Sequence, residues 1–157
     1  GFGEPGPVLD RIRGGGARVL IALGHDVLDP AFGASEALFR GLDTLILLDS
    51  HHSALERIAH VVLPARVAAE KLGTLTNHQG RVQRVEPAVE PVHLALAEGD
   101  ALTRIGQLLG LPGFAPGWAW DPRAVARFIG EVVPAFAGVD LDSVGPSGMP
   151  LGGGASA

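Results

Sequence analysis

The residue types best suited to chemistry gather between Glu70 and Val85, in an otherwise apolar chain. The segment EKLGTLTNHQGRVQRV contains two short β-type runs, GTLT and RVQRV, on either side of a polar turn. Gly73 and Gly80 permit backbone conformations that other residues avoid, so free amides near them can approach an anion or the edge of a ring. The segment is therefore either an exposed structural hairpin or a place where a polar ligand is held.

The side chains of this segment can form several kinds of hydrogen bond. Thr74, Thr76 and Asn77 can donate and accept, and Arg81 can form a forked contact with a carboxylate or phosphate group. Glu70 can hold Arg81 or a backbone amide. A structural hairpin whose polar groups satisfy one another explains the same composition, so both interpretations stay open on the residues alone.

Metal and hydrolase chemistry find little support elsewhere in the sequence. The adjacent His51 and His52 cannot share one helical face, and no H-x-x-x-H pair or carboxylate partner lies at ligand spacing. Ser50 stands between His51 and Asp49 but lacks the G-x-S-x-G turn of a hydrolase. Adjacent side chains point apart, so we expect no catalytic triad here.

Three short, nearly continuous apolar runs predict buried strands over residues 18–23, 43–49 and 60–64. Between the first two, Asp29 and Pro30 suit the start of a helix and Gly41 suits its end. Ser53 and Glu56 have the spacing of a capping box that opens a short helix before the third strand. Strands that alternate with helices and lack polar alternation are typical of a parallel sheet covered on both faces.

Right-handed crossovers place the loops after these strands on one edge of the sheet, where such sheets bind ligands. Gly24 and His25 follow the first strand, and Asp49 and Ser50 lie at the end of the second. The polar segment of residues 70–85 follows the third strand and begins on the same edge. This edge is the predicted ligand site.

Two helices are predicted after the polar segment. Asp100 suits the start of the first and Gly110 its end, while Asp121 and Pro122 open the second, which stops before Pro134. The predicted organisation is a flexible lead-in over residues 1–16, an α/β domain over 17–110, a linker and helix over 111–137, and a disordered tail over 138–157.

Composition limits the classes of function. The chain has 157 residues, of which 46% are hydrophobic and 18% charged, as in globular proteins. A net charge of −5 offers no basic surface for nucleic acid. No apolar run approaches the roughly 18 residues of a membrane span. Cysteine is absent, which excludes disulfides, thiolate nucleophiles, iron–sulfur ligands and cysteine-based zinc sites from this chain.

The order of motifs from residue 17 to about residue 110 closely resembles the molybdopterin oxidoreductase superfamily. The matching elements are HVVLPA at 60–65, Glu70, Gly73-Thr74, Thr76-Asn77, Gly80-Arg81 and Gln83. Upstream, LGHDVLDP is similar to the family's turn after a strand, and TLILLDSHHSALERIAH is similar to its next strand and helix. The resemblance implies a Rossmann-like parallel sheet flanked by helices, with the polar hairpin and a C-terminal helical extension.

Within that superfamily the ending EVVPAFAGVDLDSVGPSGMPL looks like the C-terminal region of the large peripheral-arm subunit of NADH-quinone oxidoreductase, respiratory complex I. This resemblance implies a non-catalytic structural module without a cofactor of its own. The iron–sulfur clusters of that subunit would lie in N-terminal domains outside this chain. The implied partners are other peripheral-arm subunits, with neither nucleic acid nor a direct membrane span. The implied location is the cytoplasmic face of the inner membrane.

Two alternatives remain. The chain could be the pterin-binding part of a molybdenum or tungsten bis-pterin enzyme such as a formate dehydrogenase, or a stand-alone module that binds a small molecule. His25 replaces the family's usual Asn, and SHH at 50–52 departs from its pattern on the ligand edge. By resemblance, the vestigial or pterin-contacting residues are Gly24, His25, Asp49, Ser50, Glu70, Gly73, Thr74, Asn77, Gly80 and Arg81.

Overall fold

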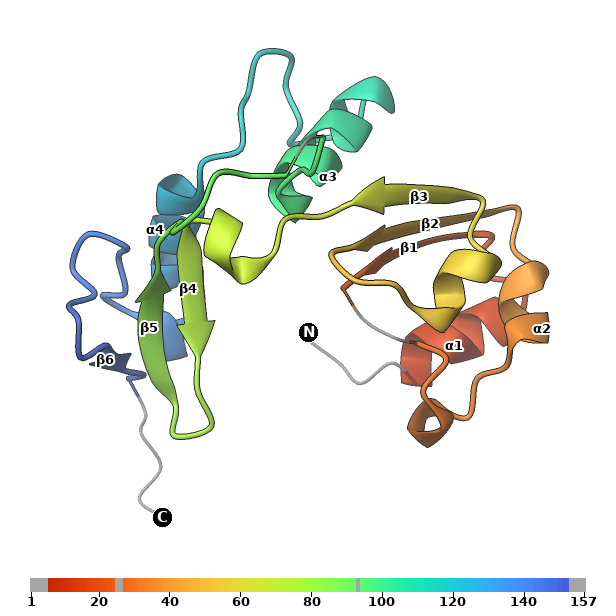
Figure 1. The fold of residues 1–157 in the computed structure, drawn as a ribbon, viewed down its shortest axis with the longest axis horizontal. Coiled ribbons are helices and arrows are strands. Elements are labelled where there is room, and N and C mark those ends of the chain that lie inside the picture. The colour runs from red at the N-terminus through yellow and green to blue at the C-terminus, as the bar shows by residue number, and fades with distance from the viewer. Residues whose placement is uncertain (1–5, 25–26, 93, 153–157) are drawn as a thin grey trace. The chain divides into compact units, whose positions relative to one another are not determined.

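A computed structural model describes residues 6–24, 27–92 and 94–152, which form two compact units (Figure 1). The first unit comprises Gly1–Arg66 and His93–Glu98, and the second comprises Val67–Val92 and Gly99–Ala157. The polar segment therefore belongs to a different unit from the three predicted strands, although the sequence analysis placed both in one domain over residues 17–110.

The first unit is built on a parallel sheet whose strands are β1 (Val19–Leu23), β2 (Thr44–Asp49) and β3 (Val61–Pro64). Their order in the sheet is β1-β2-β3, and both neighbouring pairs run parallel (Figure 1). The prediction that the three apolar runs share one sheet, flanked by helices in an α/β fold, is confirmed. The carboxyl ends of the strands consequently lie along one edge.

One face of this sheet carries the core of the first unit. Ala22 of β1 and Leu45 and Leu47 of β2 are buried there against side chains of four helical segments, including the fully buried Phe39 and Leu55. These segments are α1 (Gly6–Arg13), η1 (Pro30–Phe32), α2 (Glu36–Arg40) and η2 (Ala54–Arg57). Full burial of side chains of this size contributes roughly 1.5–3 kcal/mol each, which makes this face the main stabilising contact of the unit.

Residues 6–13 form helix α1, so the expectation of a flexible lead-in is wrong for them. Leu9 and Ile12, three residues apart, share one side of the helix and are buried in the core. Pro7 is compatible with the first turn because its missing amide hydrogen has no partner within a helix there. The rest of the segment is rich in Gly, a composition that favours a flexible segment, and a single apolar pair is a weak sign of a helix.

The helix expected from Asp29 to Gly41 is divided into η1 and α2. Asp29 caps η1 as predicted, because its Oδ1 accepts a hydrogen bond from the Ala31 amide at 2.8 Å. Gly33 then adopts a left-handed conformation with φ of 61°, which ends the first turn. The predicted capping box at Ser53 does not form, since Ser53 makes no side-chain capping bond.

Strand β3 is not the buried strand that the sequence predicts. Val61 is 43% exposed and Val62 is 44% exposed. In the described sheet β3 is an edge strand that pairs along its length only with β2, so the side chains of β3 are less buried than those of the central strand β2.

The second unit contains the predicted hairpin, formed by β4 (Gly73–Thr76) and β5 (Arg81–Val85) in antiparallel register. A short helical turn, η3 (Ala68–Glu70), precedes it, and β6 (Met149–Pro150) adds to the outer edge of β5. The disordered tail predicted for residues 138–157 is therefore wrong for residues 139–152. Val139 and Val144 pack with Val82 of β5 in a small apolar core, and sparse hydrophobic residues among glycines gave little sign of it.

The remaining helices are α3 (Glu98–Leu108), α4 (Pro122–Val132) and η4 (Pro134–Phe136). Helix α3 begins before Asp100, which was predicted to cap it. Asp121 caps α4 as predicted, and the helix leaves large apolar side chains exposed, Phe128 at 59% and Val132 at 55%. Among the helices of residues 6–24, 27–92 and 94–152, none has the length and apolar composition needed to cross a membrane.

Candidate functional site

The carboxyl end of β2 places several polar groups close together. Asp49 ends the strand, and its Oδ1 accepts a hydrogen bond from the His51 amide at 3.1 Å. Ser50 Oγ lies 2.9 Å from His51 Nδ1, so the expectation that these adjacent side chains point apart is wrong. Asp49 contacts the His51 backbone rather than its imidazole, and Ser50 is exposed. The arrangement is therefore a polar loop and not a catalytic triad.

Gly24 brings the end of β1 beside this loop. Its amide donates to the Leu48 carbonyl oxygen at 2.8 Å, and its φ of 54° lies in the left-handed region where glycine is favoured. The structure thus brings Gly24 close to Asp49 at one sheet edge, as the sequence predicts. His25, the other residue proposed at the end of β1, lies outside the described residues.

A hollow of about 250 Å³ lies over the carboxyl ends of β2 and β3. Its apolar floor and polar rim are formed by Leu47, Val62 and Pro64 and by Asp49, Ser50, His51, His52 and Glu56. Asp49 and Ser50 were predicted as site residues from the sequence, whereas Glu56 and both histidines were not. Among the described residues that line this hollow there is no Lys or Arg, and the titratable groups are the carboxylates of Asp49 and Glu56 and the two histidines.

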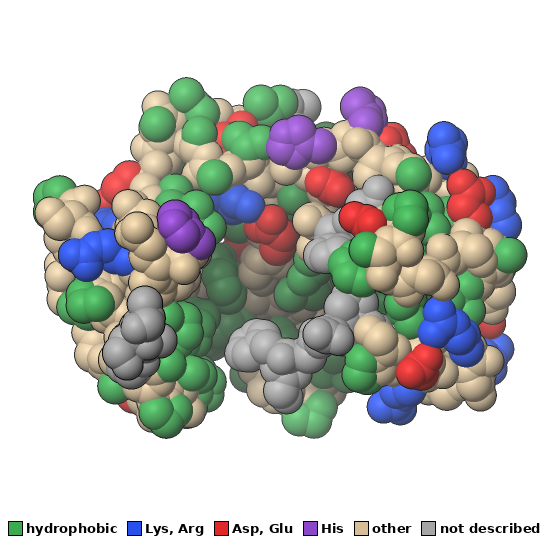
Figure 2. All heavy atoms as spheres, turned by 90° about the horizontal axis from the view of Figure 1, so that it is seen from below, with side chains coloured by type: hydrophobic (Ala, Val, Ile, Leu, Met, Phe, Trp, Pro, Cys, Tyr) green, Lys and Arg blue, Asp and Glu red, His purple; other side chains and the backbone are tan. Residues whose placement is uncertain are grey.

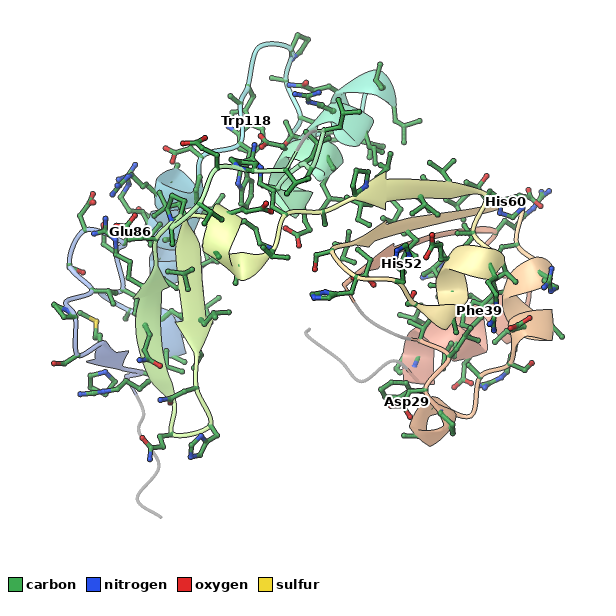
Figure 3. The ribbon with its side chains drawn as sticks, viewed as in Figure 1. Asp29, Phe39, His52, His60, Glu86 and Trp118 are labelled. Atoms are coloured by element: carbon green, nitrogen blue, oxygen red, sulfur yellow. The ribbon has the colours of Figure 1, made fainter. Side chains whose placement is uncertain are left out.

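His52, labelled in Figure 3, forms an exposed ion pair with Glu56, four residues further along the chain. The expectation that no carboxylate lies at ligand spacing from these histidines is therefore wrong. His52 Nδ1 lies 2.7 Å from Glu56 Oε2, and this hydrogen bond, together with the carboxylate charge, raises the pKa of His52 above its usual 6.5. The side chain of His52 is 96% exposed, so solvent screens the pair and its contribution to stability is small.

His60 has a structural role at the start of β3. Its backbone amide donates to the Leu45 carbonyl oxygen at 2.9 Å, and its Nδ1 accepts from the Leu45 amide at 3.0 Å. The imidazole, labelled in Figure 3 beside the start of β3, therefore extends the hydrogen bonding between β2 and β3 by one position. This histidine belongs to the fold and not to the hollow.

In the second unit, Glu70 serves the backbone. The residue is 6% exposed, and its carboxylate Oε2 accepts from the Val67 amide at 2.9 Å while Oε1 accepts from the Val92 amide at 2.8 Å. Of the two roles that the sequence left open for Glu70, the structure supports the contact with backbone amides. The carboxylate joins two segments that are 25 residues apart, 92 − 67, and so closes the loop that contains the hairpin.

In the hairpin turn, the predicted polar residue Asn77 also accepts hydrogen bonds from backbone amides. Asn77 Oδ1 accepts from the amides of Gln79 and Arg81, both at 3.0 Å, and Gly80 supplies the left-handed conformation with φ of 68°. Gly73 and Thr74 lie in β4 opposite Val85 and Arg84, and Arg81 opens β5. The bonds of Glu70 and Asn77 favour the structural interpretation of this segment.

The described residues offer no sign of metal or nucleic-acid binding. Within residues 6–24, 27–92 and 94–152, no three His, Asp or Glu side chains are placed to hold a metal ion. The face shown in Figure 2 mixes acidic, basic and apolar side chains without a broad basic patch, consistent with the net charge of −5.

Comparison with known proteins gives one family. The sequence profile described as Molybdopterin oxidoreductase matches residues 9–97. The alpha subunit of an NADPH-Fe(3+) oxidoreductase from Geobacter sulfurreducens is 33% identical over 151 residues, which cover 94% of this chain and 17% of the relative. A formate dehydrogenase-like protein of Staphylococcus aureus is 28% identical over 138 residues, which cover 86% of this chain and 14% of that protein. The chain thus spans about a sixth of the length of these relatives.

Proposed function

Because the chain belongs to the molybdopterin oxidoreductase family, we propose that it is a structural α/β part of a larger oxidoreductase and holds no redox centre itself. In its specific form, the proposal assigns the chain to the large peripheral-arm subunit of NADH-quinone oxidoreductase, respiratory complex I. Iron–sulfur clusters outside this chain would carry electrons from NADH to quinone. The chain would support assembly with the other peripheral-arm subunits at the cytoplasmic face of the membrane.

The bonding of Glu70 and Asn77 is the observation that carries this proposal. Both side chains belong to the segment that the family resemblance marks for cofactor contact, yet their oxygens accept from four backbone amides of the chain itself. Glu70 is 6% exposed and its carboxylate already accepts from two amides, so little of it is accessible to a ligand. These residue types are therefore explained by the fold without a cofactor.

The hollow beside Asp49 fits a pterin dinucleotide only in part. Its volume of about 250 Å³ is below the roughly 300–1,000 Å³ of sites that enclose a whole small molecule. A dinucleotide also carries a diphosphate, for which Arg, Lys or a helix N-terminus is the usual partner, and the lining contains neither Arg nor Lys. The Asp49 and Glu56 carboxylates suit hydroxyl or amino groups, as on a ribose or a heterocyclic base.

That partial fit favours a second candidate, the pterin-binding part of a molybdenum or tungsten enzyme such as a formate dehydrogenase. The hollow lies at the carboxyl edge of a parallel sheet, where ligands of such folds bind. The similarity to a formate dehydrogenase-like protein is consistent with it. If this candidate is correct, Asp49 would accept hydrogen bonds from the nucleotide half of the cofactor. The metal that the pterin holds would supply the redox chemistry from outside this chain.

Titration with guanosine diphosphate separates the two candidates, because this probe carries a base, a ribose and a diphosphate. The ring signals of His51 and His52 would be followed by NMR while the nucleotide is raised to about 1 mM, a weak-binding limit of roughly −4 kcal/mol. The structural proposal predicts no saturable change. A saturable shift that the variant Asp49→Asn removes would favour the second candidate instead.

A further inference from the structure

The sheet of the first unit has a second face that none of the unit's four helical segments covers. In the parallel register, Ile21, Ile46 and Val61 lie side by side on this face, opposite to Ala22, Leu47 and Val62. Val19 and Leu23 follow the same alternation along β1. Leu48 and Leu63 lie on the same face at the carboxyl end of the sheet, where Leu48 is fully buried, so this end of the face is covered within the chain. The remaining five residues, Val19, Ile21, Leu23, Ile46 and Val61, are called the open face below.

The open face is apolar and accessible in the described structure. Val19 is 57% exposed, Leu23 39% and Val61 43%, while Ile21 and Ile46 are half-buried. Parallel sheets occur almost only with both faces covered, because their strands are apolar on both sides. A contiguous apolar surface of this kind marks a place where another segment binds.

The outer edge of β1 is open in the same place. The Gly24 amide donates to Leu48, and the Thr44 amide donates to the Arg18 carbonyl oxygen, so residues 18 and 24 face β2. Since backbone groups of a parallel strand alternate between its two neighbours, the amides and carbonyls of residues 19, 21 and 23 face away from β2. Since no other described strand pairs with β1 on that side, the same three residues present backbone groups at the edge and apolar side chains on the open face.

The crossovers indicate what kind of segment fits. The connection from β1 to β2 contains α2, and that from β2 to β3 contains η2, and both lie with α1 on the covered face (Figure 1). Parallel crossovers are right-handed. Strands added in the direction from β1 to β3 keep their helices on the covered face, whereas strands added outward from β1 place their helices on the open face.

We propose that a strand–helix unit from the larger polypeptide docks here, with its strand parallel to β1 and the apolar side of its helix on the open face. This inference rests on the proposed place of the chain in a larger protein, and it is independent of whether a pterin is bound. The length of the relatives supports the choice of occupant, because the match covers 17% of the Geobacter protein and leaves 83%, 100 − 17, outside it.

Single-cysteine labelling tests the proposal cleanly because the chain contains no cysteine. Val19→Cys and Val61→Cys place a thiol on the open face, and Val8→Cys is the matched control, since Val8 of α1 is 49% exposed. Each variant would be labelled with a maleimide in the 157-residue chain and in the full-length protein, and the peptide that carries the thiol would be quantified by mass spectrometry. Hydrogen exchange of the unsubstituted proteins gives a second reading at residues 19, 21 and 23.

In the full-length protein the two open-face thiols are expected to react about tenfold or more slowly than in the 157-residue chain, since thiol reactivity follows access. The amides at the β1 edge should exchange about 100-fold more slowly there. Equal rates in both proteins would overturn the proposal. Slow labelling of the 157-residue chain that depends on its concentration would also overturn it, because a second copy would then be the occupant. Neither outcome affects a measurement of bound pterin or metal, so failure here is distinct from failure of the proposed function.

Discussion

Removal of the Glu70 carboxylate is the most informative single substitution, because it tests whether this residue holds the fold. Glu70→Ala deletes the acceptor of both the Val67 and the Val92 amides, at 2.9 and 2.8 Å. Each hydrogen bond to a charged group contributes about 1.5–3 kcal/mol, so the loss of two predicts a decrease of about 3 kcal/mol or more in the free energy of unfolding. Glu70→Gln keeps one acceptor oxygen and should cost about half as much.

Urea unfolding followed by tryptophan fluorescence measures this change in the correct part of the molecule, because Trp118 and Trp120 both belong to the second unit. With a denaturant dependence of about 1–3 kcal/mol per molar urea, a loss of about 3 kcal/mol lowers the unfolding midpoint by about 1–3 M. The exposed Glu90→Ala is the matched control and should leave the midpoint unchanged within about 0.5 kcal/mol. A Glu70→Ala midpoint equal to that of the control would refute the structural role of Glu70.

Three further predictions, two of them substitutions, follow from the described contacts. Asn77→Ala removes the acceptor of two turn amides at 3.0 Å and should lower the unfolding free energy by about 1–3 kcal/mol, measured by urea unfolding. Gly106→Ala should lower it by about 1–3 kcal/mol, because the added Cβ would lie 2.4 Å from the Phe114 ring, a clash larger than the gain of about 1 kcal/mol in helix propensity. The pKa of His52, followed by NMR, should lie above 6.5 because of its bond to Glu56; this contribution to stability is present below pH 6.5 and is lost as the pH rises through the raised pKa.

Each of these predictions has a control in the same chain. Asn77→Asp keeps the accepting oxygen and should retain most of the stability, so an equal loss in Ala and Asp variants would argue against the turn hydrogen bonds. Gly145→Ala adds a Cβ with no neighbouring atom within 4 Å and should have little effect. Glu56→Gln should return the pKa of His52 toward 6.5, and an unchanged value would contradict the assigned cause.

The three parallel strands and the hairpin could be predicted because local sequence and tertiary packing agree there. Leu45 and Leu47 are almost fully buried on the covered face of β2, and Leu48 is fully buried on the opposite face at the carboxyl end of the strand, so its apolar run is continuous there, while Ile46 on the open face is half-buried. Asn77 and Gly80 form the expected turn because their local hydrogen bonds and backbone conformation need no distant partner.

Features that depend on distant partners were missed. Leu9 and Ile12 are too few to mark a helix in a Gly-rich segment, and the sheet core is what stabilises α1. Val139 and Val144 are buried by β5, more than 50 residues earlier in the chain. His52 and Glu56 lie at the hollow because the chain at η2 passes back over β2 and β3. The sequence pattern at these residues instead predicted a capping box between Ser53 and Glu56, which does not form.

Metal content of the purified full-length protein tests the central claim most directly. Molybdenum and tungsten would be measured by inductively coupled plasma mass spectrometry and related to the amount of polypeptide. If the protein is a structural family member whose α/β part holds no redox centre, neither metal should be present above trace level. One molybdenum or tungsten atom per polypeptide would contradict that account and establish the pterin-dependent alternative.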